Sequence, residues 1–241
     1  MQRPKIGVVI PARNEEDSIA LVLDAIPQQF PSTVVVVDNN STDQTAAMAR
    51  EHGAVVLQEE LPGYGRVVQT GLRYFKDHPV DIVVFLDGDY SDYPEEMGQL
   101  VEPIMNQGYD MVLSTRLNPL YDKKSLSPHV IYGNKLVVLL INRLFAADYT
   151  DLGPFRAIRY DALKQLQMED NNYGWTVEMQ VKARLYRLKV KEVPVRYRAR
   201  IGTSKISGTI KGSVLAGAKM IYTALKLLPS RAGSLVKQQI H

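Results

Sequence analysis

The sequence predicts an α/β protein, a doubly wound and mostly parallel sheet followed by a C-terminal amphipathic helical segment. Short apolar runs that end in polar residues alternate with stretches whose apolar side chains recur every three or four positions. The chain has 241 residues, of which 45% are hydrophobic, and this suffices for one large core. No internal repeat or low-complexity segment breaks the alternation. We expect one main domain over residues 1–206, and a loop with an amphipathic helix and tail over residues 207–241.

The first half of the chain alternates predicted strands with predicted helices. Three short apolar runs predict buried parallel strands: residues 6–10, 34–37 and 82–86. Helical spacing of apolar side chains predicts three helices: residues 15–26, 45–51 and 66–75. In this interpretation Pro11 ends the first strand. Alternating strands and helices form a right-handed, doubly wound sheet, and ligands of such sheets bind outside the carboxyl ends of the strands.

After residue 100 the pattern changes. We expect two strands and two helices in this part: strands at residues 111–115 and 190–197, and helices at residues 130–145 and 177–186. Pro194 places the last strand at an edge of the sheet, because proline cannot donate to a neighbouring strand. Residues 202–212 form a loop rich in Gly, Ser, Thr and Lys, the flexible kind that closes over ligands.

The composition excludes several classes of site and partner. Without cysteine there is no disulfide framework, thiolate nucleophile or Cys-type metal site, and a reducing cytoplasm is the natural location. The N-terminus has no apolar signal core. The longest apolar run, residues 136–141, is far shorter than the ~20 residues that cross a bilayer. Lys and Arg number 29 against 26 Asp and Glu, so the mild net charge of +3 argues against a nucleic-acid partner.

Polar residues follow three predicted strands, at the edge of the sheet where ligands bind: residues 11–15, 38–41 and 87–89. Residues 41–43 would also be good helix N-caps, and capping alone is an alternative explanation for them. Asp87 and Asp89 are different, because two carboxylates at the end of a buried strand repel each other unless a cation lies between them. Gly88 lets backbone approach closely. Hard oxygen ligands point to Mg²⁺ or Mn²⁺, whose natural partner is a diphosphate.

These stretches carry a resemblance to a known family. Residues 10–16 (IPARNEE), 36–43 (VVDNNSTD) and 87–89 (DGD) resemble the family 2 inverting glycosyltransferases, which have the GT-A fold. Three further stretches look like the dolichyl-phosphate mannose synthase branch of polyprenyl-phosphate glycosyltransferases: residues 151–156 (DLGPFR), 173–178 (YGWTVE) and 192–195 (EVPV). The resemblance covers roughly residues 5–212.

The resemblance implies a role for each matched position. The residues that would bind the nucleotide-sugar donor are Pro11, Arg13, Glu15, Asp38, Asn39, Asp87, Gly88, Arg200 and Lys205. Asp38 would hold the base or the ribose. Arg200 and Lys205 would meet the diphosphate, although plain surface charge is an alternative for both. Asp87 and Asp89 would hold the metal, which gives Asp89 its place in catalysis.

Three positions depart from the pattern of that branch. Asn39 stands where a second Asp is common, which keeps hydrogen bonding but loses a charge, so UDP and GDP both stay candidates. Ser91 stands where the mannose synthases have Gln, and would be a shorter metal-side ligand acting through water. Arg116 matches an arginine expected near a lipid phosphate acceptor, but the second arginine of that site is replaced near His129.

The chemistry of the acceptor decides whether a catalytic base is needed. A hydroxyl acceptor would need one, and Asp151 and Glu178 are the candidates. A phosphate acceptor needs none, because it is already ionised. Glu178 also has a structural interpretation, since it supplies favourable charge at the N-terminus of a predicted helix.

Together the residues predict metal-dependent transfer, with inversion, of a hexose from a UDP- or GDP-sugar to a polyprenyl phosphate or another small acceptor. One alternative is a nucleotidyltransferase of similar fold, which would need a Gly-rich, Lys-containing loop that residues 11–17 do not offer. The other is a non-catalytic module that binds nucleotide-sugars. The presence of Asp87, Asp89 and Arg200 argues against it.

The C-terminal helix predicts contact with a membrane. Over residues 210–228 apolar side chains recur at steps of three and four, and Lys211, Lys219 and Lys226 lie beside that face. An interfacial helix on an anionic membrane has this arrangement. Residues 136–144 would add a second apolar surface. We expect peripheral attachment to the cytoplasmic membrane face, and the alternative is that both helices pack on the sheet as ordinary core.

Overall fold

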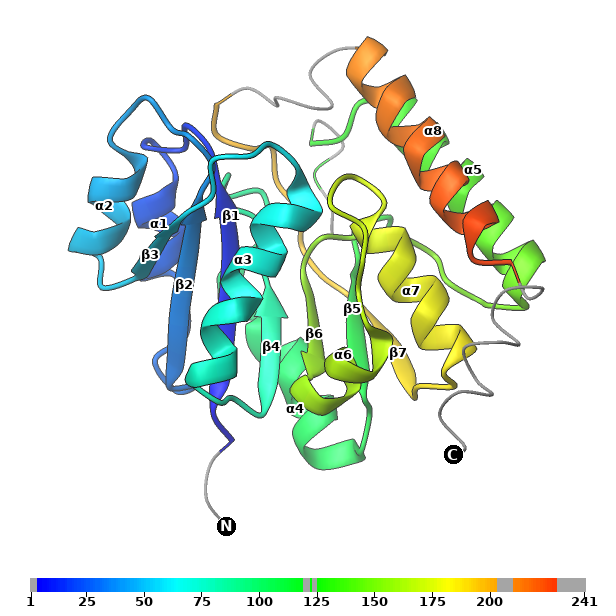
Figure 1. Ribbon diagram of the computed structural model, residues 1–241, viewed down its shortest axis with the longest axis horizontal. Helices are drawn as coiled ribbons and strands as arrows, with labels where there is room; N and C mark the ends of the chain where they lie inside the picture. Colours follow the sequence, from blue (N-terminus) through cyan, green and yellow to red (C-terminus); the bar gives the residue numbers. More distant parts are fainter. Residues whose placement is uncertain (1–3, 119–121, 123–124, 203–209, 229–241) are drawn as a thin grey trace.

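The protein is built on one seven-stranded sheet, in the order β3-β2-β1-β4-β6-β5-β7 (Figure 1). The computed structural model describes residues 4–118, 122, 125–202 and 210–228. The strands are β1 (Ile6–Ala12), β2 (Ser32–Asp38), β3 (Val55–Gln58), β4 (Ile82–Phe85), β5 (Met111–Thr115), β6 (Arg156–Arg159) and β7 (Val190–Pro194). The helices are α1 (Ile19–Asp24), α2 (Thr45–Glu51), α3 (Tyr64–Asp77), α4 (Met97–Gln107), α5 (Pro128–Phe145), α6 (Tyr160–Leu166), α7 (Trp175–Leu185) and α8 (Ile210–Lys226), and a short 3₁₀ turn (Pro94–Glu96) precedes α4.

The sheet is mostly parallel, as the sequence predicts. β1 pairs in parallel with β2 and β4, β2 pairs with β3, and β5 pairs with β7. β6 lies between β4 and β5 and runs antiparallel to both. β7 is at the end of the sheet, so the prediction of an edge strand with Pro194 is confirmed.

Helices cover both faces of the sheet, and the alternation of strand side chains divides the core accordingly. Val9, Val35 and Val37 pack under α3, α5 and α7 on one face. Val8 and Val36 pack under α1, α2 and α4 on the other. Both faces are buried because the strands are apolar at successive positions, which is the composition expected of a parallel sheet covered on both sides.

The amphipathic C-terminal helix is present as α8, which lies against α5 and α7 at the outer side of the molecule (Figure 1). Ala216, Thr223 and Ala224 are its buried residues. α5 packs on the core through Val137 and Ile141, so the core-packing alternative is correct for the inner side of α5. Among the described residues no helix combines the length and the apolar character that a membrane crossing requires. The predicted boundary at residue 206 lies outside the described residues.

Two details of the sequence prediction were wrong or incomplete. β1 continues through Pro11, which pairs with Val37, to Ala12. Proline is tolerated there because the pairing of β1 with β4 ends at Val9, so no β4 carbonyl needs the missing N–H. The first helix is also shorter than expected, because the segment before Ile19 forms turns held by the backbone carbonyl of Glu15.

Candidate functional site

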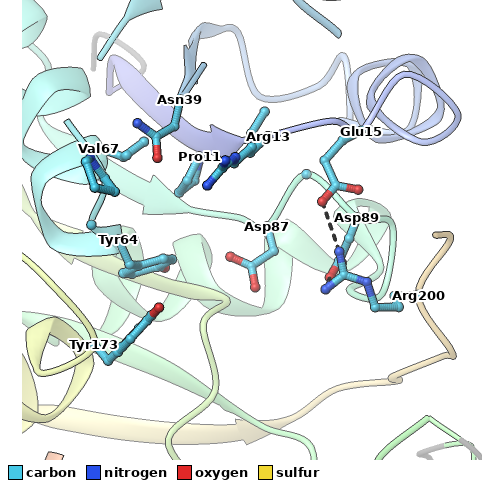
Figure 2. Close-up of a pocket in the computed structure, with 14 residues that line it drawn as sticks. Pro11, Arg13, Glu15, Asn39, Tyr64, Val67, Asp87, Asp89, Tyr173 and Arg200 are labelled. Carbon is cyan, nitrogen blue, oxygen red and sulfur yellow. Dashed lines mark hydrogen bonds and ion pairs between the residues drawn. The ribbon is translucent and has the colours of Figure 1, made fainter. Parts of the chain in front are cut away.

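A pocket of about 260 Å³ opens at the carboxyl ends of β1, β2 and β4, where the sequence predicts the ligand site. Its lining comes from these strand ends, from the start of α3 and from two more distant segments: Pro11, Ala12, Arg13, Glu15, Asn39, Pro62, Gly63, Tyr64, Val67, Asp87, Gly88, Asp89, Tyr173 and Arg200. Figure 2 shows Asp87 between the two tyrosines on one side and a group of Glu15, Asp89 and Arg200 on the other.

The acidic turn after β4 is held against the end of β1. The backbone carbonyl of Gly88 accepts a hydrogen bond of 2.8 Å from the Ser18 hydroxyl. A Cβ on Gly88 would lie 3.2 Å from the carbonyl oxygen of Pro11, which explains why the close approach of these two loops favours glycine. The close backbone approach that the sequence predicts at Gly88 is therefore present.

Negative charge accumulates at this turn. Burial raises the pKa of Asp87, and the Asp89 carboxylate raises it further. Asp92 is also buried, and burial followed by the charges of Asp87 and Asp89 raises the pKa of Asp92 well above its usual value. Neither carboxyl oxygen of Asp92 meets a donor in good hydrogen-bond geometry among the described residues. Buried carboxylates without enough positive partners are the donor set that a hard divalent cation stabilises.

Asp89 is engaged on both carboxyl oxygens. Its Oδ1 accepts hydrogen bonds from the Ser91 hydroxyl, at 2.5 Å, and from the Ser91 backbone N–H, at 2.9 Å. Its Oδ2 lies 3.0 Å from Nη1 of Arg200, whose Nη2 donates to Glu15 at 2.9 Å. The predicted metal ligands Asp87, Asp89 and Ser91 are thus adjacent, and Arg200 joins them from a segment far away in sequence. No group of three or more His, Cys, Asp or Glu in the described part of the chain has the arrangement of a metal site.

The predicted donor-binding residues divide into two groups. Pro11, Arg13, Glu15, Asn39 and Arg200 line the pocket, as expected. The Asn39 amide donates to the carbonyls of residues 59 and 61, at 2.6 and 3.0 Å, and so fixes the segment before α3.

Asp38 is buried at the end of β2 and is not part of the pocket lining. Its Oδ1 accepts hydrogen bonds from the side chain and the backbone of Ser41, so it shapes the following turn. Its role toward a base or ribose stays a prediction. Lys205 lies outside the described residues.

Arg116 and Asp151 form a buried pair instead of facing the pocket. The Arg116 guanidinium donates to both Asp151 oxygens, each at 2.9 Å, and its backbone N–H donates to Oδ2 at 2.8 Å. The Asn134 amide donates to Oδ1 at 2.8 Å. Burial would raise the pKa of Asp151, but the charge and hydrogen bonds of Arg116 hold that pKa below its usual value. These contacts suit Asp151 to holding Arg116, and its use as a base stays an untested prediction.

Glu178 and His129 also lie outside the pocket lining. Glu178 is buried in the first turn of α7, where it pairs with Lys182 at 2.7 Å. It also accepts hydrogen bonds from the backbone N–H groups of Glu169 and Asp170. His129 is exposed in the first turn of α5 and lies 3.2 Å from the Ser127 hydroxyl. These contacts give Glu178 a structural role in joining α7 to the preceding turn, beyond the charge at the helix N-terminus that the sequence suggests. Its use as a base and the acceptor role of His129 stay predictions.

Sequence reasoning did not assign a role to three residues of this region. Tyr64, from the start of α3, and Tyr173, from the turn before α7, lie on the same side of the pocket (Figure 2). Burial raises the pKa of Tyr64, and the Asp87 charge contributes further. Asp92 is buried close enough to Asp87 and Asp89 for their charges to raise its pKa. A third carboxylate close to the Asp-x-Asp pattern and the Gly-Tyr-Gly stretch at residues 63–65 were the available signals.

Comparison with known proteins agrees with this geometry. The model of the family described as Glycosyl transferase family 2 matches residues 7–167. An uncharacterized glycosyltransferase of Mycobacterium tuberculosis is 35% identical over 215 residues, which cover 88% of this chain and 94% of that protein. The dolichyl-phosphate hexose transferase of Haloferax volcanii is 30% identical over 224 residues, 92% of this chain and 94% of that one.

Among solved structures, the fold is similar to that of glucosyl-3-phosphoglycerate synthase from Mycobacterium tuberculosis in complex with Mn²⁺, UDP and glucosyl-3-phosphoglycerate. The TM-score is 0.73 at 24% identity, over 93% of this chain and 80% of that one. The likeness confirms the GT-A fold. With a family model that spans most of the catalytic sheet and relatives that align over nearly their full length, the chain belongs to glycosyl transferase family 2.

Proposed function

We propose that this enzyme transfers a hexose, with inversion, from a UDP- or GDP-sugar to a polyprenyl phosphate, in a reaction that needs Mg²⁺ or Mn²⁺. The observation that carries the proposal is the pocket at the strand ends, which is lined by Asp87 and Asp89 and by Arg200, the ion-pair partner of Asp89. The names of the relatives support the reaction class, and the dolichyl-phosphate hexose transferase supports a lipid phosphate acceptor.

The pocket suits a nucleoside diphosphate at both ends. Tyr64 and Tyr173 offer aromatic surface at one end, where a base or a sugar ring can stack. Arg200 brings positive charge to the other end and Arg13 to the middle (Figure 2), and guanidinium groups can bind phosphate oxygens in pairs. A nucleotide-sugar would thus lie along the strand ends, with its diphosphate beside the acidic turn.

The residues present fit a divalent cation. Asp87 and Asp89 would hold it, with Ser91 as a neighbouring hydroxyl ligand, because Asp87 is a half-buried and Asp89 a buried oxygen donor, and each adds negative charge next to the other. When bound, the cation would neutralise the charge that develops on the leaving diphosphate. Arg200, now paired with Glu15 and Asp89, would add its own charge to the same phosphate groups.

The transfer reaction needs no basic residue of the protein to remove a proton from the acceptor. A phosphate oxygen of the lipid attacks the anomeric carbon, and the bond from that carbon to the nucleoside diphosphate breaks with its electron pair going to the diphosphate. The products are a polyprenyl-phosphate sugar and the nucleoside diphosphate. Because the acceptor phosphate is ionised already, no proton has to be removed, and the engagement of Asp151 and Glu178 in buried pairs is no obstacle.

A lipid acceptor requires contact with a membrane, and the exposed side chains of α5 and α8 support this. These neighbouring helices carry large apolar residues in water: Tyr132, Leu136, Leu139, Val214, Leu215, Tyr222 and Leu225. We propose that this surface, the α5/α8 surface, docks peripherally on the cytoplasmic membrane face.

The lysines of α8 contribute unequally to the electrostatic part of this docking. Lys219 pairs with Asp170 at 2.8 Å, and Lys226 lies 3.9 Å from Glu169. The charge of Lys219 is therefore offset by a partner within the protein, whereas Lys226 and Glu169 are both exposed. The side chain of Lys211 is outside the described set. The apolar contribution to docking therefore carries more of the proposal than the electrostatic one.

The function is tested by incubating the purified chain with each of UDP-glucose, UDP-galactose, GDP-mannose and GDP-glucose, with a short polyprenyl phosphate in detergent. We expect one donor to give a lipid-linked sugar with the inverted anomeric configuration, detected by mass spectrometry and NMR, and EDTA to stop its formation. Turnover that continues in EDTA would remove the metal role of Asp87 and Asp89. Transfer to 3-phosphoglycerate, with no transfer to the lipid, would replace the proposed acceptor with a soluble one.

A further inference from the structure

One wall of the donor pocket is a short turn from a distant part of the sequence. Residues 170–174 belong to the connection between α6 and α7, and Tyr173 from this turn lines the pocket. The turn is held in place by contacts on two sides, with the start of α3 and with α8.

On the side of the pocket, the turn lies directly on the start of α3. The backbone N–H of Arg66 donates to the carbonyl of Asn171 at 3.1 Å. A Cβ on Gly63 would collide with the Asn171 carbonyl, and a Cβ on Gly65 would collide with the Asp170 carbonyl. The Gly-Tyr-Gly stretch therefore has a packing function: it lets the turn approach closely enough that Tyr64 and Tyr173 form one aromatic wall.

On the opposite side, the turn is bound by α8. Lys219 and the Thr223 hydroxyl both contact Oδ2 of Asp170, at 2.8 and 3.3 Å. A Cβ on Gly174 would collide with the Thr223 hydroxyl and with Asp170 itself. The Asp170 side chain is only 7% exposed, so this contact is an interior one although Lys219 reaches it from the surface.

Asp170 joins these contacts to the conformation of the turn. While Oδ2 is held by α8, Oδ1 accepts hydrogen bonds from the backbone N–H groups of Asn172, at 2.7 Å, and Gly174, at 3.2 Å. These two N–H groups flank Tyr173 in the sequence. One carboxylate thus fixes both sides of the pocket tyrosine and is itself oriented by the outer helix.

We propose that Asp170 is a positioning residue through which α8 sets the place of Tyr173 and hence the shape of the donor pocket. The α5/α8 surface and the pocket are two ends of one contiguous set of contacts, because α8 carries exposed apolar residues such as Val214 and Leu215 and also holds Asp170. This inference rests on the proposed function only for the identity of the donor.

The chain supplies its own probe and its own control. Trp175 is the only tryptophan, follows the turn directly and is buried, so its emission reports on the turn in the ligand-free protein. The test variants are Lys219→Met and Thr223→Ala. The matched control is Lys226→Met, which removes the same charge from the same helix but from a partner, Glu169, that is itself exposed. Lys219→Arg is the conservative variant that can still reach Asp170.

We expect Lys219→Met and Thr223→Ala to shift Trp175 emission to longer wavelength and to increase its quenching by acrylamide, both measured at a temperature well below the unfolding transition of each variant. We also expect Lys219→Met to weaken binding of UDP with Mn²⁺ by roughly tenfold in calorimetry, the scale of one charge-assisted hydrogen bond. Lys226→Met should change neither quantity, and Lys219→Arg should restore both.

The inference is overturned if Lys219→Met and Lys226→Met give the same emission and the same quenching, whatever they do to UDP binding. If the unmodified protein does not bind UDP, GDP with Mn²⁺ replaces it as the probe. Absence of binding by both nucleotides would reject the proposed function, while the Trp175 measurements would still decide the role of Asp170.

Discussion

At the scale of single residues, the site depends on a few carboxylates whose partners decide what each can do. Asp89 faces the pocket and shares its oxygens between Ser91 and Arg200. Asp151 is buried and shares its oxygens among Arg116, Asn134 and the backbone. The sequence predicts a functional role for both, but Asp89 faces the pocket whereas Asp151 is enclosed in a buried ion pair.

Replacing Asp89 with Asn should abolish transfer and leave the fold intact. The substitution removes an anionic ligand at the place where leaving-group charge appears, while the amide oxygen can still accept from Ser91. We expect a loss of at least about a hundredfold in kcat, measured with saturating donor, together with weaker Mn²⁺ binding in electron paramagnetic resonance. Retained activity with unchanged Mn²⁺ binding would mean that the cation is held elsewhere.

Replacing Asp151 with Asn should act on stability. Arg116 would remain charged and buried beside a neutral amide, and breaking a buried pair in this way costs about 3–5 kcal/mol. Guanidinium unfolding measures the change in free energy, and Asp161→Asn, which breaks an exposed pair with Lys164, is the control with little expected effect. Loss of transfer with an unchanged unfolding midpoint would instead support Asp151 as a base.

At the scale of elements, the sequence predicts best those helices and strands whose pattern is local. The bounds of α2 and β5 match the expected residues 45–51 and 111–115. β3 was missed because it is four residues long and only half-buried. β6 was missed because its sequence begins and ends with arginine, and the burial of Arg156 depends on the carbonyl of Gly153, a contact that no periodicity reveals. α4 contains Pro103, which hides its helical pattern.

A Gly→Ala substitution inside a helix usually stabilises a protein. The packing of α3 against β1 is tight enough that Gly71→Ala should be destabilising instead. A Cβ on Gly71 would lie 2.7 Å from Cγ1 of Val9 and 3.1 Å from Cγ2 of Val37. Overpacking of this kind costs about 1–3 kcal/mol. A Cβ on Gly133, in α5, meets nothing within 4 Å, so the better helix propensity of alanine should stabilise the protein by about 0.5–1 kcal/mol.

We therefore expect Gly71→Ala to lower the free energy of unfolding and Gly133→Ala to raise it, both measured by urea denaturation at the same pH. Adding Val9→Ala to the Gly71→Ala variant should recover part of the loss, since it removes the methyl group that the new Cβ meets. A change of the same sign in both single variants would contradict the packing of α3 described above.

The α5/α8 surface allows a test of docking that does not disturb the fold. Leu139 and Leu215 are 62% and 58% exposed, so Leu→Gln at these two positions should leave the thermal midpoint nearly unchanged. Each should weaken sedimentation with vesicles of anionic and neutral phospholipid by about tenfold, because the apolar chain no longer enters the acyl boundary. Leu61→Gln, at a residue 56% exposed but away from both helices, is the control. Equal binding by all three variants would exclude this surface as the contact.

At the scale of the whole molecule, a site assembled from distant segments should stabilise the protein when it is filled. Residues 11–15, 87–89 and 200 meet at the pocket from separate parts of the chain. A ligand that binds only the folded state at a hundred times its Kd adds about 2.7 kcal/mol, which corresponds to a rise in Tm of about 5 to 10 °C for a chain of this size. Differential scanning fluorimetry with UDP or GDP and Mn²⁺ measures the rise, and EDTA should remove it.

The same assembly explains how far the site could be predicted. Residues directly after predicted strands, such as Pro11 and Asp87, were placed correctly because the edge of a parallel sheet collects strand ends. Tyr64 and Tyr173 come from a helix start and a remote turn, and their meeting depends on close backbone contact at Gly63 and Gly65. The pairing of Arg116 with Asp151 could not be predicted either, because it depends on an antiparallel strand that lacks an apolar pattern.

That pairing brings the two ends of one long segment of the chain together at the same edge of the sheet. Arg116 follows β5 and Asp151 precedes β6, and because β6 runs against β5, the two residues meet at the same edge of the sheet. The segment between these two residues, which includes α5, therefore leaves and rejoins the sheet at this ion pair, while α5 itself packs on the core through Val137 and Ile141. Residues 116 and 151 are natural junctions for exchanging the segment with a relative's, provided that the incoming helix supplies matching apolar side chains toward the core.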